Sequence, residues 1–396
     1  MVNQNSLIFS IILIAVILSP IFLVVWTTNI NKQDPLPNFL VGVEYAIANH
    51  SVEDVKALVD RVKNFTNLFV VDSLGITLDR NNLDEVCDYV YDSGLYFVVF
   101  FITPVEIENS QRVFRYNYYP HLWIADAKEK FGKKFLGAYT QDEPGGNQMD
   151  SGTFQLVEEA KDQTEAAELF VDLLRGHIFY YLSTKENEDI SVLTSDYGLY
   201  WYDYKAGYDT VLVEFAWNHS RPLNVALGRG AANVQKRDWG IMVTWTYLQP
   251  PYIVSGDELY EDLTIAYHNG AKYAVIFDHP DTGYSDYGIL TEKHFDALEQ
   301  FWNYMNDNPR KHGIIKGEAV YVLPENFGFG FRTAEDNIWG LWSGDTDERV
   351  EKIWSDANQL IEEYDFNLDV IYSDPDFNAD LQRQYEQVIF WNETIT

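Results

Sequence analysis

From Phe39 onward, short apolar runs alternate with amphipathic stretches, and this alternation constrains the fold more than any other feature of the chain. The pattern is typical of repeated strand–helix units. In the first unit Ser51 is a suitable N-cap and Asp54 the matching capping-box acid of a helix that follows the strand. The predicted strands are residues 39–46, 68–73, 95–103, 135–143, 190–196, 210–217, 240–247 and 272–278. The later helices are expected at 83–91, 125–131, 164–182, 222–235, 257–268 and 291–306.

Eight strands over this length predict a (β/α)8 barrel, since such barrels take about 250 residues. A doubly wound sheet is the alternative, but neither G-x-G-x-x-G nor G-x-x-x-x-G-K-[ST] follows any strand. The barrel is assigned to residues 39–309. Residues 310–396 are predicted to form a small α/β accessory domain, with strands at 318–324, 367–374 and 386–392 and a helix at 347–364.

The first 38 residues form a separate region. Leu7 to Trp26 is an uncharged apolar run, long enough to cross a bilayer as a helix of about 20 residues. A cleaved signal peptide is the alternative, but no basic residue precedes the run and no small-x-small site follows it. We therefore predict a single-pass membrane anchor followed by a short tether. Lys32 alone is weak evidence for orientation.

The amino-acid composition limits the classes of molecule that the protein can bind. The chain has 28 Lys and Arg against 61 Asp and Glu, a formal net charge of -33, and 16% aromatic residues. Such a charge excludes nucleic acid as a partner, because phosphate binding needs a cationic face. The acidity, the aromatic content and the absence of a cytoplasmic cofactor motif favour a soluble domain outside the cytoplasm. The single cysteine, Cys87, excludes a disulfide framework and falls on the apolar stripe of a predicted helix.

Acidic residues stand at the ends of most predicted strands. Barrels of this kind carry their reacting groups there, so these residues are candidates for one site: Glu44, Asp72, Asp142, Glu143, Asp196, Glu214 and Asp278. Aromatic residues are interleaved with them, chiefly Tyr197, Trp217, Trp245 and Tyr247. Carboxylates can accept from sugar hydroxyls while rings stack on sugar faces, so a carbohydrate substrate is expected. The alternative is that these acids are ordinary turn and cap residues.

The segment GAYTQDEPGG, residues 137–146, is the most specific motif. Pro144 is expected to hold Glu143 in an extended conformation. Asp142-Glu143-Pro144 resembles the Asn-Glu-Pro motif on the fourth strand of retaining (β/α)8 glycoside hydrolases. The resemblance implies that Glu143 is the general acid/base. Asp142 stands where that clan has Asn, a residue that binds the sugar's 2-hydroxyl, and an acid there would raise the pKa of Glu143.

The second catalytic carboxylate is less defined. The resemblance implies a glutamate on the seventh strand, but residues 240–251, GIMVTWTYLQPP, contain none. Glu214, on the sixth strand, is the predicted nucleophile, followed by Asp196 and Asp278. Alternatively, Glu214 is a structural acid paired with Arg221 or Arg229.

Other signals are weaker. The eight histidines include no H-x-H or H-E-x-x-H pattern, so neither a metal nor a cofactor is expected. His219 and His279 lie just beyond strand ends; contact with substrate is one interpretation, and solvated loop histidines are the favoured one. The C-terminal segment is loosely similar to the small domains of β-galactosidase-like enzymes.

Two rival functions remain for the whole protein: an inactive glycan-binding or envelope barrel, and a metal-dependent polysaccharide hydrolase or deacetylase.

Overall fold

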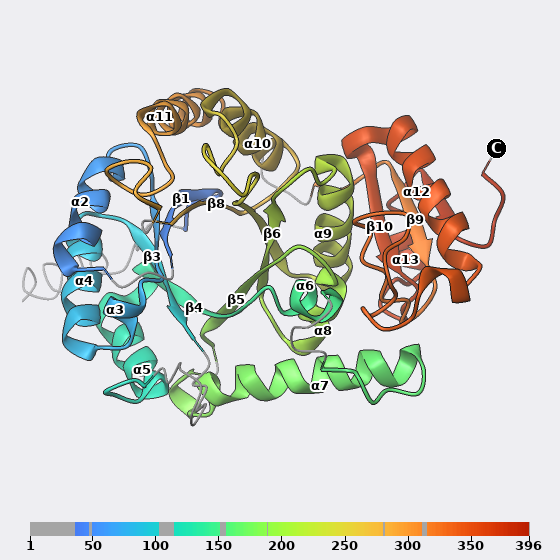
Figure 1. Ribbon diagram of the computed structural model, residues 1–396, viewed down its shortest axis with the longest axis horizontal. Helices are drawn as coiled ribbons and strands as arrows, with labels where there is room; N and C mark the ends of the chain where they lie inside the picture. Colours follow the sequence, from blue (N-terminus) through green and yellow to red (C-terminus); the bar gives the residue numbers. More distant parts are fainter. Residues whose placement is uncertain are drawn as a thin grey trace, which may run out of the picture. The chain divides into compact units, whose positions relative to one another are not determined.

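Eight parallel strands close into a barrel in chain order, which confirms the predicted architecture (Figure 1). The strands are β1 (Leu40–Tyr45), β2 (Leu68–Val71), β3 (Tyr96–Phe101), β4 (Phe135–Asp142), β5 (Ser191–Asp196), β6 (Thr210–Phe215), β7 (Asp238–Val243) and β8 (Tyr273–Asp278). Closure comes from β1, whose Leu40 to Tyr45 pair in register with Tyr273 to Asp278 of β8. Gly42 permits close strand contact, because a Cβ there would lie 1.9 Å from the Leu68 carbonyl oxygen.

The computed structural model describes residues 36–46, 50–102, 115–150, 156–187, 189–279, 282–310 and 315–395. The predicted membrane anchor, Leu7 to Trp26, lies outside these residues. Among the described helices, none combines the length and the apolar character that a bilayer crossing requires.

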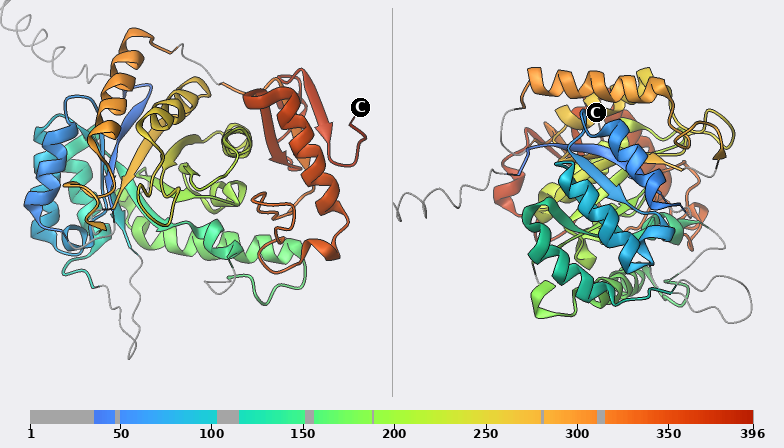
Figure 2. Two further views of the ribbon diagram at one scale, coloured as in Figure 1. Left: turned by 45° about the horizontal axis from the view of Figure 1, so that its top comes forward. Right: turned by 90° about the vertical axis from the view of Figure 1, so that its left-hand side faces the viewer.

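Helices surround the barrel, as two further views show (Figure 2). They are α2 (Val52–Val62), α3 (Leu74–Thr77), α4 (Arg80–Asp92), α5 (Pro120–Phe131), α6 (Pro144–Met149), α7 (Gln163–Leu182), α8 (Tyr200–Ala206), α9 (Arg221–Gln235), α10 (Gly256–His268) and α11 (Glu292–Asp307). Helix α2 begins with the predicted capping box: Ser51 accepts from the Asp54 N–H, and Asp54 accepts from the Ser51 N–H. The short helices α3, α6 and α8 were not predicted, because four to seven residues are too few to show a helical apolar stripe.

Strand β7 ends at Val243, four residues before its predicted end. The N–H groups of Thr246 and Tyr247 donate to the carbonyl of Tyr252 rather than to a neighbouring strand. The apolar and aromatic run through Tyr247 therefore belongs partly to a loop. Tyr247 therefore lies in a loop beyond β7, and not at the strand end where the sequence predicts it.

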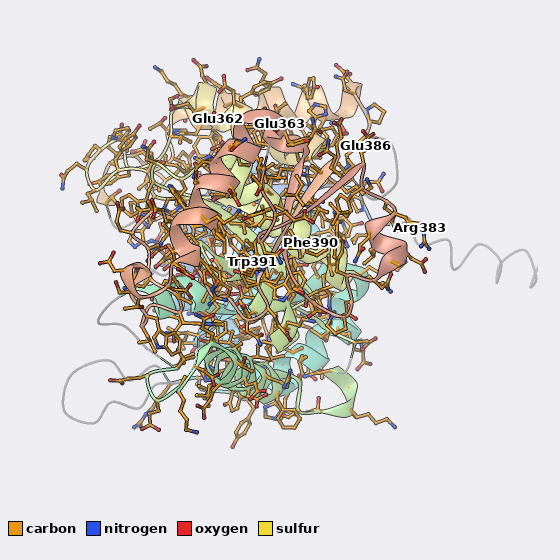
Figure 3. All side chains as sticks on the ribbon, turned by 90° about the vertical axis from the view of Figure 1, so that its right-hand side faces the viewer. Glu362, Glu363, Arg383, Glu386, Phe390 and Trp391 are labelled. Atoms are coloured by element: carbon orange, nitrogen blue, oxygen red, sulfur yellow. The ribbon has the colours of Figure 1, made fainter. Side chains whose placement is uncertain are left out.

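The C-terminal residues form a second, three-stranded parallel sheet in the order β10-β9-β11. Its elements are β9 (Ala319–Leu323), α12 (Arg349–Tyr364), β10 (Leu368–Tyr372), α13 (Ala379–Gln382) and β11 (Gln387–Phe390). Helix α9 of the barrel packs against β10 (Figure 1). Gly230 allows this approach, because a Cβ there would lie 2.5 Å from the Val370 carbonyl oxygen. Figure 3 views the C-terminal elements from the side of the chain's end and labels Phe390 and Trp391 there.

A buried ion pair joins the barrel to this sheet. Arg229 on α9 and Asp369 on β10 are 1% and 0% exposed, and Nε donates to Oδ1 over 2.7 Å. The guanidinium also donates to the carbonyls of Phe366 and Leu368, while Asp369 Oδ2 accepts from the Tyr385 hydroxyl. Each charge is thus compensated and each polar atom has a partner, the condition under which a buried pair is tolerated.

Replacing Asp369 by alanine should lower the free energy of unfolding by about 3–5 kcal/mol, because the Arg229 charge would remain buried without its partner. Urea unfolding followed by circular dichroism measures this loss. The matched control is Asp380→Ala in the exposed pair with Arg383, which should leave the unfolding midpoint nearly unchanged. Equal effects of the two substitutions would contradict the assignment.

Candidate active site

A cavity of about 520 Å³ opens at the carboxyl ends of the barrel strands. Residues from seven of the strands or their following loops line it, and so does Arg332 of the C-terminal segment. The lining consists of Glu44, Asp72, Asp142, Glu143, Asp150, Tyr197, Glu214, Trp217, His219, Met242, Thr244, Trp245, Phe277, His279 and Arg332. The structure therefore brings together five of the seven predicted strand-end acids and three of the four predicted substrate-binding aromatics.

The end of β4 has an irregular backbone, and this backbone sets the direction of the Asp142 and Glu143 side chains. The register with β5 shifts between Tyr139 and Asp142, and Gln141 has a φ of 59°. Glu143 is also left-handed, with φ 51° and ψ 48°. The expectation of an extended Glu143 is therefore wrong. Proline disfavours the right-handed helical region in the preceding residue, and a direct turn from strand into α6 requires left-handed rather than extended backbone here.

Asp196 holds this turn in place. Its carboxylate accepts from the N–H groups of Gly145 and Gly146, over 2.5 and 2.7 Å, and from those of Tyr197 and Gly198. Both glycines are needed for the approach: a Cβ on Gly145 would lie 2.8 Å from Asp196 Oδ2, and one on Gly146 would lie 2.1 Å from the Tyr197 ring. Asp196, a predicted substrate-binding residue and reserve nucleophile, is thus outside the cavity lining and fixes the backbone beside Glu143.

Glu143 and Glu214 form the central pair of the cavity. Their carboxyl groups are in hydrogen-bonding contact with each other. Ser195 Oγ lies 2.9 Å from Glu214 Oε1 and 3.0 Å from Asp142 Oδ1, and the Tyr139 hydroxyl donates to Asp142 over 2.9 Å. The Tyr139 hydroxyl also lies 2.8 Å from Ser195 Oγ, so the two hydroxyl groups connect Asp142 and Glu214 in one hydrogen-bond network.

Neither arginine considered as a partner of Glu214 contacts it. Arg221 forms an ion pair with Asp262, and Arg229 forms the pair with Asp369. The structural alternative for Glu214, an ion pair with one of these arginines, is therefore wrong. The charged side chains near Glu214 are acids, and Glu214 itself lines the cavity.

Burial controls the protonation of these acids. It raises the pKa of Glu143 to about 8, with the nearby charge of Asp142 adding to the effect. Burial, and then the proximity of Glu143, raises the pKa of Glu214 well above its ordinary value. The pKa of Asp142 is also raised by burial. The pair therefore retains a proton at neutral pH, as a general acid requires.

A second carboxyl pair lies deeper, at the ends of β1 and β2. Glu44 and Asp72 are both 2% exposed and are in hydrogen-bonding contact. Burial, with the nearby Asp142, raises the pKa of Glu44 to about 8. The cavity thus contains two adjoining carboxyl pairs, one from β4 and β6 and one from β1 and β2.

Aromatic side chains form the walls. Trp245 packs against Phe277 and His279, with ring centroids 5.4 and 5.6 Å apart. Trp217, at φ 45°, is 41% exposed and also lines the cavity. His219 and His279 lie in the loops after β6 and β8, are partly exposed and line the cavity, where a bound ligand would meet them.

Two predicted site residues lie elsewhere. Tyr247 is 44% exposed and is not part of the cavity lining, because β7 ends before it. Asp278 is fully buried, and its Oδ1 accepts from the N–H groups of Ile289 and Leu290. Asp278 therefore organises the loop after β8.

Arg332 comes from the loop after β9 and was not predicted. Its guanidinium donates from Nε and Nη2 to Asp336, over 3.0 and 2.8 Å, and from Nη1 to Asp150. Asp150 in turn accepts from the Tyr197 hydroxyl over 2.5 Å. The Gly- and aromatic-rich run NFGFGF just before Arg332 was the available signal, because such a run permits close approach to another part of the chain.

Comparison with solved structures identifies the architecture. The chain aligns with GH5_18 from Bifidobacterium longum subsp. longum ATCC 55813 at a TM-score of 0.54 and 11% identity, over 91% of this chain and 99% of that one. It also aligns with α-L-fucosidase isoenzyme 2 from Paenibacillus thiaminolyticus at a TM-score of 0.50 and 9% identity, over 89% of this chain and 60% of that one. At these identities the likeness shows a shared (β/α)8 fold. No protein-family model and no curated protein matches the sequence.

These likenesses concern the fold. The roles of Glu143 and Glu214 stay predictions. The looser similarity of the C-terminal segment to β-galactosidase-like enzymes also stays a prediction. Among the described residues, no three His, Cys, Asp or Glu side chains form a group that could hold a metal ion.

Proposed function

We propose that this protein is a glycoside hydrolase in which Glu143 is the general acid/base and Glu214 the nucleophile. The observation that carries the proposal is the contact between these two buried carboxyl groups inside an aromatic-walled cavity at the carboxyl ends of the strands. Likeness of fold to GH5_18 and to the fucosidase supports it.

The proposed roles require the proton that the pair retains to be on Glu143 when the sugar binds. The Ser195 hydroxyl can donate to Glu214, which lowers the pKa of that carboxyl against the larger rise caused by its burial. Glu143 then protonates the leaving oxygen while a Glu214 oxygen attacks the anomeric carbon. In the second half of the reaction Glu143 removes a proton from water, and the attacking hydroxide releases the sugar from Glu214.

The separation favours retention of configuration. Inverting enzymes keep their carboxyl groups about 6.5–9.5 Å apart to admit a water molecule, whereas retaining enzymes bring them to about 5–5.5 Å. Carboxyls in hydrogen-bonding contact are closer than the inverting arrangement allows.

A catalytically inactive glycan-binding barrel is the second candidate. It is favoured by the absence of a carboxylate at the carboxyl end of β7, whose sequence is DWGIMV, where the resemblance places the nucleophile. On this view the cavity binds sugar but lacks a correctly placed second acid.

Assaying the protein with a panel of aryl glycosides and oligosaccharides separates the two candidates. We expect hydrolysis of at least one, with the first-formed sugar retaining the configuration of the substrate by NMR. Binding of a glycan without turnover in the wild type would exclude the enzyme, and an inverted first product would exclude Glu214 as a nucleophile.

The cellular setting is also a proposal. The apolar run from Leu7 to Trp26 supports a single-pass anchor that holds residues 39–396 at a membrane surface, outside the cytoplasm. Protease protection of intact cells or vesicles, with an antibody to the C-terminal residues, tests this topology.

A further inference from the structure

Glu44 is a buried acid to which the proposed reaction assigns no role. It lines the cavity from β1 and is 2% exposed. Its carboxyl group contacts Asp72, but no N–H group and no hydroxyl group of the described residues donates to its Oε2 atom. A buried carboxyl oxygen without a partner is costly, so its presence at a cavity wall indicates a ligand group that donates to it.

The charges around Glu44 define which donor it would take. Six carboxyl groups line the cavity: those of Glu44, Asp72, Asp142, Glu143, Asp150 and Glu214. Among the described residues of the lining, Arg332 is the only lysine or arginine. Its guanidinium is held by Asp336 and Asp150. Burial lowers the pKa of His219, so this side chain adds no positive charge at neutral pH.

An anionic ligand is therefore disfavoured in this cavity. A uronic acid or a sulfated sugar would meet carboxyl groups on several strands, and the one guanidinium is already engaged by two aspartates. A cation would instead relieve the repulsion among the acids. An ammonium group supplies three donors and a positive charge, and both suit Glu44 Oε2 and the neighbouring Asp72.

We propose that Glu44 and Asp72 form a subsite for a sugar that carries a protonated amine, such as a 2-amino-2-deoxy sugar. The proposal rests on the proposed function only in that the cavity binds carbohydrate. The amine would donate to Glu44 Oε2 and contact Asp72, while Trp245 and Phe277 line the same cavity beside the sugar ring. The subsite would distinguish an amino sugar from other sugars by the positive charge of its amine rather than by the size of its ring.

Binding of matched methyl glycosides to the full-length protein tests this directly. The probes are the methyl glycosides of glucosamine and galactosamine, their N-acetyl forms, methyl glucoside, methyl galactoside and methyl glucuronide, measured at pH 7 by calorimetry. We expect at least one free amine to bind about tenfold or more tightly than its N-acetyl and hydroxyl counterparts. Equal affinities, no detectable binding of either amine, or preference for the glucuronide would overturn the proposal.

Glu44→Gln keeps the shape of the side chain but cannot ionise beside an ammonium group, so it should abolish the preference for the amine. Glu351→Gln, on the exposed face of α12, is the matched control and should keep the preference. If Glu44→Gln does not fold, the comparison of amine with N-acetyl sugar on the wild type still decides. Hydrolysis of neutral glycans without amine preference would refute this subsite alone, whereas amine binding without turnover would refute the enzyme alone.

Discussion

Replacing Glu143 by glutamine should lower kcat by about 10³-fold on substrates with poor leaving groups, because general acid catalysis contributes about 10²–10⁴-fold. Glutamine preserves the size of the side chain but cannot give a proton to the leaving oxygen. Aryl glycosides with strongly acidic phenols need little protonation, so their first step should be affected far less. Steady-state kinetics on a series of leaving groups measures this contrast.

The pH profile provides an independent readout of the same residue. The pKa of Glu143 is raised to about 8, so the wild-type rate should fall as pH rises through that region and the proton is lost. That alkaline limb should disappear in Glu143→Gln. Glu351→Gln should retain both the rate and the limb. A kcat unchanged by Glu143→Gln, on any substrate that the wild type hydrolyses with a poor leaving group, would remove Glu143 from the mechanism.

Replacing Glu214 by glutamine should have the larger effect, with kcat reduced by about 10⁴-fold or more, as when a covalent nucleophile is removed. An amide oxygen is too weak a nucleophile to form the glycosyl intermediate. Added azide should restore turnover by attacking the anomeric carbon directly and displacing the protonated leaving group. The product is a glycosyl azide of inverted configuration, identified by NMR.

Azide also distinguishes the two roles. In Glu143→Gln the covalent intermediate still forms on Glu214 when the leaving group is good, so azide attack would give a glycosyl azide with retained configuration. If Glu214→Gln gave the glycosyl azide of retained configuration and Glu143→Gln the inverted one, Glu143 would be the nucleophile and Glu214 the general acid/base. Absence of any azide product in Glu214→Gln, with a folded protein, would count against Glu214 as the nucleophile.

Glu214→Gln should further alter the dependence of stability on pH. The pKa of Glu214 is raised in the folded state, so its proton binds more tightly there than in the unfolded chain. Stability is then fully present below the ordinary glutamate pKa and is lost as pH rises above it. The variant lacks this group, so its melting temperature should decline less than that of the wild type between acid and alkaline pH.

The barrel could be predicted because its signals are local and repeated. Apolar runs bounded by turn residues, together with caps such as Ser51 with Asp54, specify strands and helices one at a time. The number of units then limits the fold to a few choices. The carboxyl ends of parallel strands meet at one edge, so Glu44, Asp72 and Glu214 could be assigned to a common site without knowledge of the contacts.

Residues whose roles depend on non-local contacts could not be predicted. Asp196 and Asp278 end their strands as several of the lining acids do, yet backbone N–H groups of other segments donate to their carboxylates. The left-handed Glu143 depends on Asp196, which is 53 residues later in the chain. Arg332 reaches the cavity only because a second sheet packs on α9, a contact between segments that no local pattern indicates.

The position of Arg332 also has a consequence for how the cavity is assembled during synthesis. The loop that carries it follows β9, and β9 is flanked by β10 and by β11, near the end of the sequence. Asp369, which secures β10 to α9, accepts a hydrogen bond from Tyr385. The eight barrel strands can therefore emerge from the ribosome long before one wall of their cavity exists. Until β9, β10 and β11 have paired, the barrel lacks the part of the cavity wall that Arg332 supplies.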